Sequence, residues 1–322
     1  MIYLDELKPK ISIIGAGNVG VRYAYASIIN GLARKIVLVD INKEKLMGEV
    51  MDLSHGMPYI PPVDIVAGDY EDIYNSDLVV VTAGKNQSPG ETRLDLVNKN
   101  VELFKLIVPK IMEVTPNSIL LIVSNPVDIL SYVSYKLSKK PSDEVMGSGT
   151  TLDTARFRFL LGKHCDINTR NVHAYILGEH GDSEFPIWSS AMIGGMLIKD
   201  YCQTCSKRDN CNKEERLKDV FKEVKESAYK IIEKKGETSY GIGLTLSRIT
   251  RAILNDENTI LPVSTLINNI YGVNDLYLSL PCIIHKNGIK EKLVIELNEE
   301  EEIAFRRSAK TIKGVIEKIH ID

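Results

Sequence analysis

Short apolar runs alternate with longer amphipathic stretches along the first half of this chain. Four runs have the length and composition of buried strands: 10–14, 35–39, 77–82 and 118–124. Apolar residues at helical spacing follow the first run, and a longer helix is expected from Arg93 to about Val114. Near-continuous apolar strands separated by helices predict a parallel sheet with helices on both faces.

The second half of the chain shows a different pattern. A buried strand is expected over 172–177, and the apolar stripe of 214–235 predicts an amphipathic helix. The runs 276–284 and 293–297 flank Asn287-Gly288, which predicts a hairpin with a type I′ turn. The break Gly147-Ser148-Gly149 separates the two patterns, and we place a domain boundary there.

Composition agrees with two domains in a soluble protein. At 322 residues the chain is long for one compact core, and 44% of the residues are hydrophobic. The net charge of -3 argues against nucleic acid or an anionic membrane as the main partner. No apolar stretch is long enough for a bilayer, and residues 1–6 lack the features of a signal peptide. We therefore expect a cytoplasmic protein.

A glycine motif follows the first predicted strand. Gly15, Gly17 and Gly20 form G-x-G-x-x-G between a strand and a helix, and Asp40 ends the next strand. Gly15 suits a tight turn, Gly17 allows close approach of a pyrophosphate, and Gly20 allows close packing of helix on strand. Asp40 would accept hydrogen bonds from ribose hydroxyls and repel a 2′-phosphate, which favours NAD over NADP. The alternative is a structural glycine-rich turn with a surface aspartate.

These features predict an α/β fold. We expect a Rossmann doubly wound parallel sheet over residues 1–147, followed by an α+β catalytic domain over 148–322. A helix near 238–255 is expected to pack back on the first domain. Ligands bind at the carboxyl ends of such strands, where the segments 83–91 and 125–128 leave the sheet. The first of these segments is polar and contains Gly and Pro, as a mobile lid does.

His180 lies in a glycine-rich turn, Gly178-Glu179-His180-Gly181-Asp182, where its ring has space to face a cleft. Histidine titrates near neutral pH, which suits it to give and take a proton. Asp153 and Arg156 are three residues apart and share one face of a predicted helix, whereas Arg158 points elsewhere. The alternatives are a structural histidine and a surface salt bridge of little energetic value.

Five separated motifs then carry a resemblance over nearly the whole chain. They are the glycine motif, TAGKNQSPGETR at 82–93, SNPVD at 124–128, GSGTTLDTARFR at 147–158 and GEHGDSEFPIW at 178–188. Together they resemble the L-lactate dehydrogenases, within a wider family that includes the malate dehydrogenases. The resemblance implies an NAD-dependent oxidoreductase that interconverts pyruvate and L-lactate.

The resemblance also implies roles for the reacting residues. His180 corresponds to the acid–base group, and Asp153 to the partner that fixes its tautomer and raises its pKa. Arg156 corresponds to the bidentate clamp on the substrate carboxylate. Arg93, brought in by lid closure, would polarise the carbonyl and stabilise developing negative charge.

Further positions match binding residues of the family. Asn125 corresponds to a residue near the nicotinamide and substrate, and Thr238 to the wall of the substrate pocket. The cofactor-binding positions implied are Gly15, Gly17, Asn18, Val19, Gly20, Asp40, Ala83, Gly84, Asn125 and Ser148.

Gln87 is expected to select the substrate. Malate-specific relatives carry arginine at the matching position, where it binds a second carboxylate. A neutral glutamine would leave one carboxylate of oxaloacetate unpaired in a closed site, so pyruvate fits better. Reduction of a bulkier 2-keto acid and malate dehydrogenase activity are the alternatives, as is a merely polar role for Gln87. A further alternative is a dehydrogenase fold that is kept only for nucleotide binding or structure.

Arg158 and His173 match positions where bacterial members bind fructose 1,6-bisphosphate between subunits. The resemblance therefore implies a homotetramer that the bisphosphate activates. The alternative is an exposed Arg158 in a surface ion pair and a buried neutral His173.

Cys202, Cys205 and Cys211 depart from the usual family pattern. They form C-x2-C-x5-C in a predicted polar loop, a spacing that suits zinc. Because no fourth ligand is evident, we expect thiols in a reducing cytoplasm and no metal.

Overall fold

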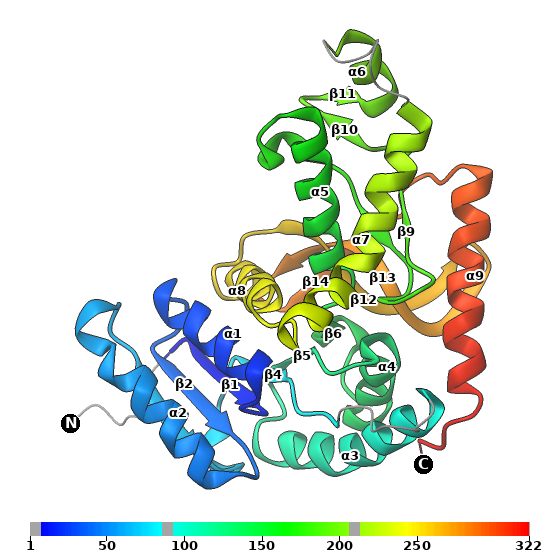
Figure 1. The fold of residues 1–322 in the computed structure, drawn as a ribbon. Helices are drawn as coiled ribbons and strands as arrows, with labels where there is room; N and C mark the ends of the chain where they lie inside the picture. Colours follow the sequence, from blue (N-terminus) through cyan, green and yellow to red (C-terminus); the bar gives the residue numbers. More distant parts are fainter. Residues whose placement is uncertain (1–7, 86–92, 206–212, 322) are drawn as a thin grey trace.

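The computed structural model describes residues 8–85, 93–205 and 213–321. A nine-stranded sheet with the order β14-β13-β12-β6-β5-β4-β1-β2-β3 runs through its centre (Figure 1). No helix within these residues is both long enough and apolar enough to cross a bilayer.

Six strands of the first half form the parallel part of this sheet. They are β1 Lys10–Ile14, β2 Lys35–Val39, β3 Asp64–Gly68, β4 Leu78–Val81, β5 Ile119–Ile122 and β6 Val145–Gly147. The connecting helices are α1 Asn18–Ile29, α2 Lys43–His55, α3 Arg93–Val114 and α4 Val127–Ser138. The strand order is that of a Rossmann sheet, so the predicted fold class is confirmed. β3 and β6 were not predicted.

The second half consists of helices, short strands and one long hairpin. Its helices are α5 Thr151–Cys165, α6 Ile198–Thr204, α7 Lys213–Lys235, α8 Tyr240–Leu254 and α9 Glu299–Ile316. Its short strands are β7 Val172–His173, β8 Ile176–Leu177, β9 Phe185–Pro186, β10 Met192–Ile193 and β11 Met196–Leu197. Its long strands are β12 Thr259–Ile270, β13 Val273–His285 and β14 Gly288–Lys292. Among the described residues, 3₁₀ turns cover Met57–Tyr59, Glu71–Ile73 and Ser142–Glu144 in the first half and Thr169–Asn171 in the second.

The long hairpin joins the two halves of the molecule. β12 pairs with β6 through Ser264 and Gly147, so the antiparallel strands β12, β13 and β14 extend the parallel sheet. Gly147 permits this approach, because a Cβ there would lie 2.4 Å from Ser131 Oγ and 2.8 Å from Ser264 Cβ. The main hydrophobic core is continuous from β1 to α9 as a result.

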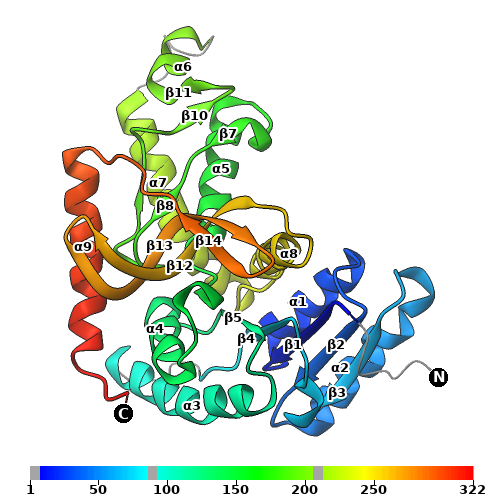
Figure 2. The same ribbon diagram turned by 180° about the vertical axis from the view of Figure 1, so that it is seen from behind.

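α8 packs back on α1, as both views of the ribbon show (Figures 1 and 2). A buried hydrogen bond of 2.7 Å joins the hydroxyls of Tyr23 and Thr250. Gly243 allows the close contact, since a Cβ there would lie 3.1 Å from the Arg22 backbone. The helix near 238–255 therefore covers the glycine-motif helix.

Three predictions of local structure were wrong. The expected strand 172–177 is two short strands, because β7 pairs with β10 whereas β8 pairs with β9. The second hairpin strand is Gly288–Lys292 and not 293–297. The turn is not type I′, which needs positive φ at both central residues. Of residues 286–288 only Gly288 has a positive φ, of 99°, and a register shift lies further along the hairpin, between the pairs Ile284–Ile289 and Ile283–Glu291.

Substitution of Gly20 is expected to destabilise the fold. A Cβ at Gly20 would lie 2.0 Å from the Gly15 carbonyl oxygen, so α1 and β1 would have to separate. We expect Gly20→Ala to lower the free energy of unfolding by about 2 kcal/mol or more, measured by urea denaturation.

Gly314→Ala is the matched control, because it also lies in a helix and no other atom lies within 4 Å of its Cβ position. We expect it to be neutral or to stabilise by up to about 1 kcal/mol. Equal effects of the two substitutions would contradict the role assigned to Gly20.

Candidate active site

The glycine turn between β1 and α1 lies at the carboxyl ends of the parallel strands. Gly15 has a φ of 106°, and a Cβ there would lie 2.6 Å from the Ala83 nitrogen. Gly17 is different, since no atom lies within 4 Å of its Cβ position. The N-terminus of α1 also lacks a side-chain cap. The turn is thus packed tightly against the sheet and open in front of Gly17, which suits a pyrophosphate.

Asp40 lies beside this turn. Its carboxylate accepts hydrogen bonds from the backbone N–H of Ala16, at 2.7 Å, and of Asn42, at 2.9 Å. These contacts fix an anionic group at the end of β2, next to the glycine motif. The arrangement fits an adenosine ribose with a 2′-hydroxyl and disfavours a 2′-phosphate.

The ends of β4 and β5 are tied together by side chains. Ser124 Oγ donates to the Ala83 carbonyl at 2.6 Å. Asn100, a buried residue of α3, accepts from the Lys85 N–H at 2.8 Å and donates to the Asn125 carbonyl at 3.0 Å. Sequence reasoning missed Asn100, because no local pattern shows that its amide bridges two loops. It fixes the start of the 83–91 segment relative to Asn125.

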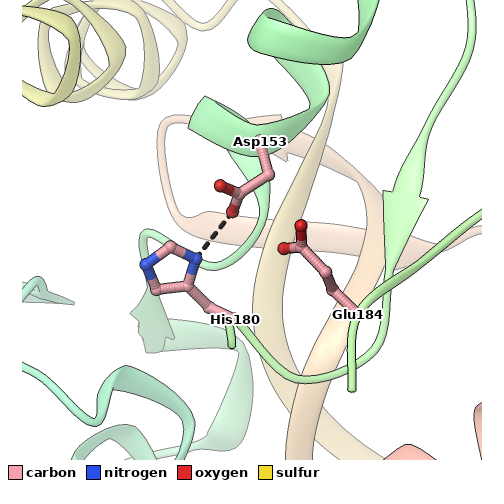
Figure 3. A group of neighbouring side chains, drawn as sticks. All are labelled: Asp153, His180 and Glu184. Carbon is pink, nitrogen blue, oxygen red and sulfur yellow. Dashed lines mark hydrogen bonds and ion pairs between the residues drawn. The ribbon is translucent and has the colours of Figure 1, made fainter. Parts of the chain in front are cut away.

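His180 and Asp153 meet, as the resemblance implies. His180 Nδ1 lies 2.6 Å from Asp153 Oδ2, and the other ring nitrogen points away from Asp153 (Figure 3). Arg156 donates to Asp153 Oδ1 at 2.7 Å. The Asp153 side chain is only 4% exposed, so the contact with Arg156 is not the surface salt bridge of the structural alternative.

The charges of this group shift its proton affinities. Burial alone lowers the pKa of His180, but the charge of Asp153 and its hydrogen bond outweigh burial and raise the pKa to about 9. Burial likewise favours the neutral form of Asp153, yet His180 and Arg156 hold its pKa below the ordinary value. At neutral pH the pair is therefore an imidazolium and a carboxylate, which is the form that donates a proton from Nε2.

Two carboxyl groups other than Asp153 lie near His180, namely Glu184 and Asp128. A carboxylate oxygen of Glu184, like one of Asp153, lies within 4.8 Å of a His180 ring nitrogen (Figure 3). Burial and the neighbouring Asp153 charge raise the pKa of Glu184 well above its ordinary value. Asp128, at the start of α4, accepts a hydrogen bond from the His180 backbone N–H at 2.8 Å. Sequence reasoning gave neither carboxyl a role.

Arg158 points away from the His180 group, as the helical spacing predicts. Its Nε donates to the Ala174 carbonyl at 2.9 Å, and its guanidinium lies 5.0 Å from the centre of the Tyr175 ring. It therefore lies against the chain that follows His173. His173 is exposed on β7, so the alternative of a buried neutral histidine was wrong.

For the other predicted site residues that the structure describes, it gives a position in the chain's fold. Gln87 lies outside the described residues, and Arg93 is the first residue of α3. Thr238 is half-buried between α7 and α8. Ser148 follows β6, where its N–H donates to the Ile122 carbonyl at 2.8 Å. The turn 178–182 and residues 83–84 and 125 lie at the carboxyl ends of the sheet strands or beside them.

The cysteines do not lie in a simple polar loop. Cys202 belongs to α6 and Cys205 ends that helix, whereas Cys211 lies outside the described residues. Among the residues that the structure describes, only Asp153, His180 and Glu184 approach one another as potential metal ligands. The expectation that this chain holds no metal stays a prediction.

Comparisons with known proteins agree with this geometry. Residues 9–147 match the model of the lactate/malate dehydrogenase NAD binding domain, and residues 150–321 match that of the lactate/malate dehydrogenase alpha/beta C-terminal domain. The chain is 52% identical to an L-lactate dehydrogenase of Thermoanaerobacter sp. (strain X514), over 97% of this chain and 99% of the relative. It is 50% identical to L-lactate dehydrogenase 1 of Clostridium acetobutylicum, over 96% and 98%.

Solved structures show the same likeness. A lactate dehydrogenase from a deep-sea metagenome library has a TM-score of 0.93 and 44% identity, over 97% of this chain and 98% of that one. The minor L-lactate dehydrogenase of Enterococcus mundtii, solved with ligands bound, has a TM-score of 0.93 and 41% identity, over 97% and 99%.

Loss of the Asp153 charge is expected to lower the pKa of His180. In Asp153→Asn the burial that favours neutral imidazole is no longer opposed by the charge and hydrogen bond of Asp153, which are the largest causes that raise this pKa. The pKa should therefore fall from about 9 to 6.5 or below, which NMR titration of the ring protons would measure. Asp166→Asn, at the other end of α5, is the control and should leave this pKa unchanged. A pKa near 9 in Asp153→Asn would contradict the assignment.

Proposed function

This chain belongs to the lactate/malate dehydrogenase family, and we propose that it is the NAD-dependent L-lactate dehydrogenase that its relatives indicate. The observation that carries the proposal is the meeting of Arg156, Asp153 and His180. This group provides a cation for a carboxylate and an acid for a carbonyl oxygen, which reduction of a 2-keto acid requires.

The residues present fit the cofactor. Gly17 leaves space for the pyrophosphate, α1 presents its N-terminus to it, and Asp40 suits the ribose. When bound in its reduced form, NADH, the cofactor would supply the hydride that reduces the 2-keto acid, and NAD would accept it in the reverse direction. We assign Asn18, Val19, Ala83, Gly84 and Ser148 to the same binding surface.

The protein's own part of the reaction is binding and proton transfer. The Nδ1 of His180 is held by Asp153, so Nε2 is the nitrogen that gives its proton to the carbonyl oxygen of pyruvate. In the reverse direction the same nitrogen takes the proton from the hydroxyl of L-lactate. Arg156 donates to Asp153 through Nη1, and its other nitrogens bind the substrate carboxylate. In this proposal Arg93 polarises the carbonyl, Asn125 forms hydrogen bonds near the nicotinamide and the substrate, and Thr238 forms part of the wall of the substrate pocket.

Gln87 provides the preference for pyruvate in this proposal. It offers no charge to a second carboxylate, whereas closure over oxaloacetate would bury one unpaired. Arginine at this position would bind that carboxylate through charge-assisted hydrogen bonds. The preference for pyruvate over oxaloacetate therefore depends on a single side chain.

Substitution of Gln87 tests which 2-keto acid the protein prefers. We expect the parent protein to reduce pyruvate with the higher kcat/KM, using NADH, and Gln87→Arg to shift the preference toward oxaloacetate by roughly 10- to 100-fold. Ser88→Arg adds the same charge one residue away and is the control.

Three other results would change the proposal. A parent that prefers oxaloacetate is a malate dehydrogenase, and one that prefers a longer 2-keto acid is a dehydrogenase of bulkier substrates. A parent that binds NADH but reduces no 2-keto acid has kept the fold without the reaction.

We further propose a homotetramer that binds fructose 1,6-bisphosphate through Arg158 and His173. The exposed imidazole of His173 and the orientation of Arg158 away from Asp153 support a site separate from the substrate. Helices α2 and α8 leave large apolar side chains exposed, namely Met47, Met51, Tyr240 and Leu244, which a second copy would cover. A cytoplasmic location stays a prediction.

The bisphosphate is expected to lower the apparent KM for pyruvate by roughly tenfold in the parent protein. Arg158→Gln should abolish this response and leave kcat at saturating pyruvate unchanged, because Arg158 does not face the His180 group. Arg307→Gln, on the exposed side of α9, is the control and should respond like the parent. Equal kinetics with and without bisphosphate would refute the activation, and sedimentation would test the tetramer separately.

A further inference from the structure

We propose that Asp128 is a positioning residue of the reaction, which holds the backbone of His180 in place and supplies a second negative charge near its imidazole. Asp128 would act through His180 and not on the substrate. The inference rests on the proposed function, because it assigns Asp128 to the proton-transfer step of that reaction.

The hydrogen bonds of Asp128 fix its carboxylate completely. Oδ2 accepts from the His180 backbone N–H at 2.8 Å, and Oδ1 accepts from Ser264 Oγ at 2.5 Å. The side chain is buried, with 1% of the residue exposed. Both oxygens are thus engaged by different elements, so the carboxylate cannot turn without breaking one of the two bonds.

Asp128 also connects the two halves of the molecule. It lies in the first turn of α4, three residues after Asn125, whereas His180 follows β8 and Ser264 lies in β12. Gly147 lets these parts approach closely, since a Cβ there would contact Val127, Ser131 and Ser264. The Asn125 loop and the proton donor therefore share one anchor, and a shift of α4 would move both.

The charge of Asp128 adds to its geometric role. Asp153 is the main cause that raises the pKa of His180, and the charges of Glu184 and Asp128 raise it further. The other charged groups that face this cluster are Arg156 from α5 and Lys225 from α7. Glu179, adjacent to His180, acts in turn on Asp128. Removal of the Asp128 charge should consequently lower the pKa of His180 by less than removal of Asp153.

Ionisation of the Asp128 carboxyl lowers the stability of the fold, whereas the proposed role needs the ionised form. Burial raises the pKa of Asp128 to about 7, against the hydrogen bonds from Ser264 and His180, which lower it. Because the ordinary value is 3.8, ionised Asp128 costs stability progressively as the pH rises from about 4 to 7. Asparagine would accept from His180 and donate to Ser264 without this cost. A purely structural role would thus be filled equally well by asparagine.

Two substitutions separate position from charge. Asp128→Asn keeps both hydrogen bonds and removes the charge, so it should remain at least as stable as the parent at pH 8. Its His180 pKa, measured by NMR titration, should fall by roughly half a unit to one unit. The alkaline limb of kcat/KM for pyruvate should move down by the same amount, since reduction needs protonated His180.

Asp128→Ala removes the anchor as well as the charge. The His180 backbone is then free to shift, and kcat should fall by roughly 10- to 100-fold with a smaller change in the KM for NADH. Asp275→Asn is the matched control. Asp275 lies on β13 and also accepts two hydrogen bonds, from Tyr132 and Lys136 of α4, the helix that carries Asp128. It should change neither the kcat nor the pKa of His180.

The outcomes decide the proposal. An unchanged His180 pKa in Asp128→Asn overturns it, as does an unchanged kcat in a folded Asp128→Ala. If Asp128→Ala does not fold, the Asn variant alone decides. If the parent reduces no 2-keto acid, the proposed function fails while the NMR titration still tests Asp128. A lowered pKa together with a lowered kcat, and an unaffected Asp275→Asn, supports the assignment.

Discussion

The chemistry of this protein depends on the buried contact between His180 Nδ1 and the Asp153 carboxylate. Burial disfavours both charges, so the pair stays ionised only because each partner stabilises the other and Arg156 adds a cation to Asp153. Arg156 consequently has two tasks, since it stabilises the carboxylate that holds the proton donor and presents its remaining N–H groups to an anion. Loss of Asp153 would leave two buried cations without the anion that compensates them.

The frame around this contact is a continuous sheet. Asp153 comes from α5 and His180 from the turn after β8, and these elements are held against β12 and β13 of the hairpin that extends the parallel sheet. Thr150 illustrates the connection, because its N–H donates to Ser279 Oγ at 3.0 Å on β13. The N-terminus of α5, and with it Asp153, is therefore fixed relative to the strands that carry the glycine turn. A two-part site of this kind keeps its geometry only if the parts share a core.

The sequence predicted those features that depend on neighbouring residues. β1, β2, β4 and β5 are buried throughout and mostly apolar, and the structure places them within two residues of the expected bounds. β3 was missed because it is an edge strand with alternating burial and ends in glycine, and β6 because three residues are too few for a pattern. The pairing of His180 with Asp153 spans 27 residues and followed only from the resemblance.

Asp128 and Asn100 were missed for another physical reason. Each forms a hydrogen bond with the backbone of a distant segment. Because every residue type except proline has the same backbone N–H and carbonyl, the sequence does not show which backbone group a side chain will bind. Side-chain chemistry can be anticipated from residue types, whereas backbone anchors appear only once the chain is folded. The turn at Gly288 was assigned to the wrong type because an Asn-Gly pair in the sequence does not by itself fix φ, and only its glycine has a positive φ in the structure.

The charges of the described side chains also bear on the choice of substrate. Ionised Asp153 and protonated His180 offset each other's charge, so Arg156 is the cation of this group that is left for a substrate carboxylate. A substrate with one carboxylate balances this charge inside a site closed to water. A second carboxylate would remain unbalanced unless another cation entered, and its burial would cost several kcal/mol. The His180 group therefore offers one cation to a substrate carboxylate, and a second carboxylate would need a cation from elsewhere, such as an arginine at position 87.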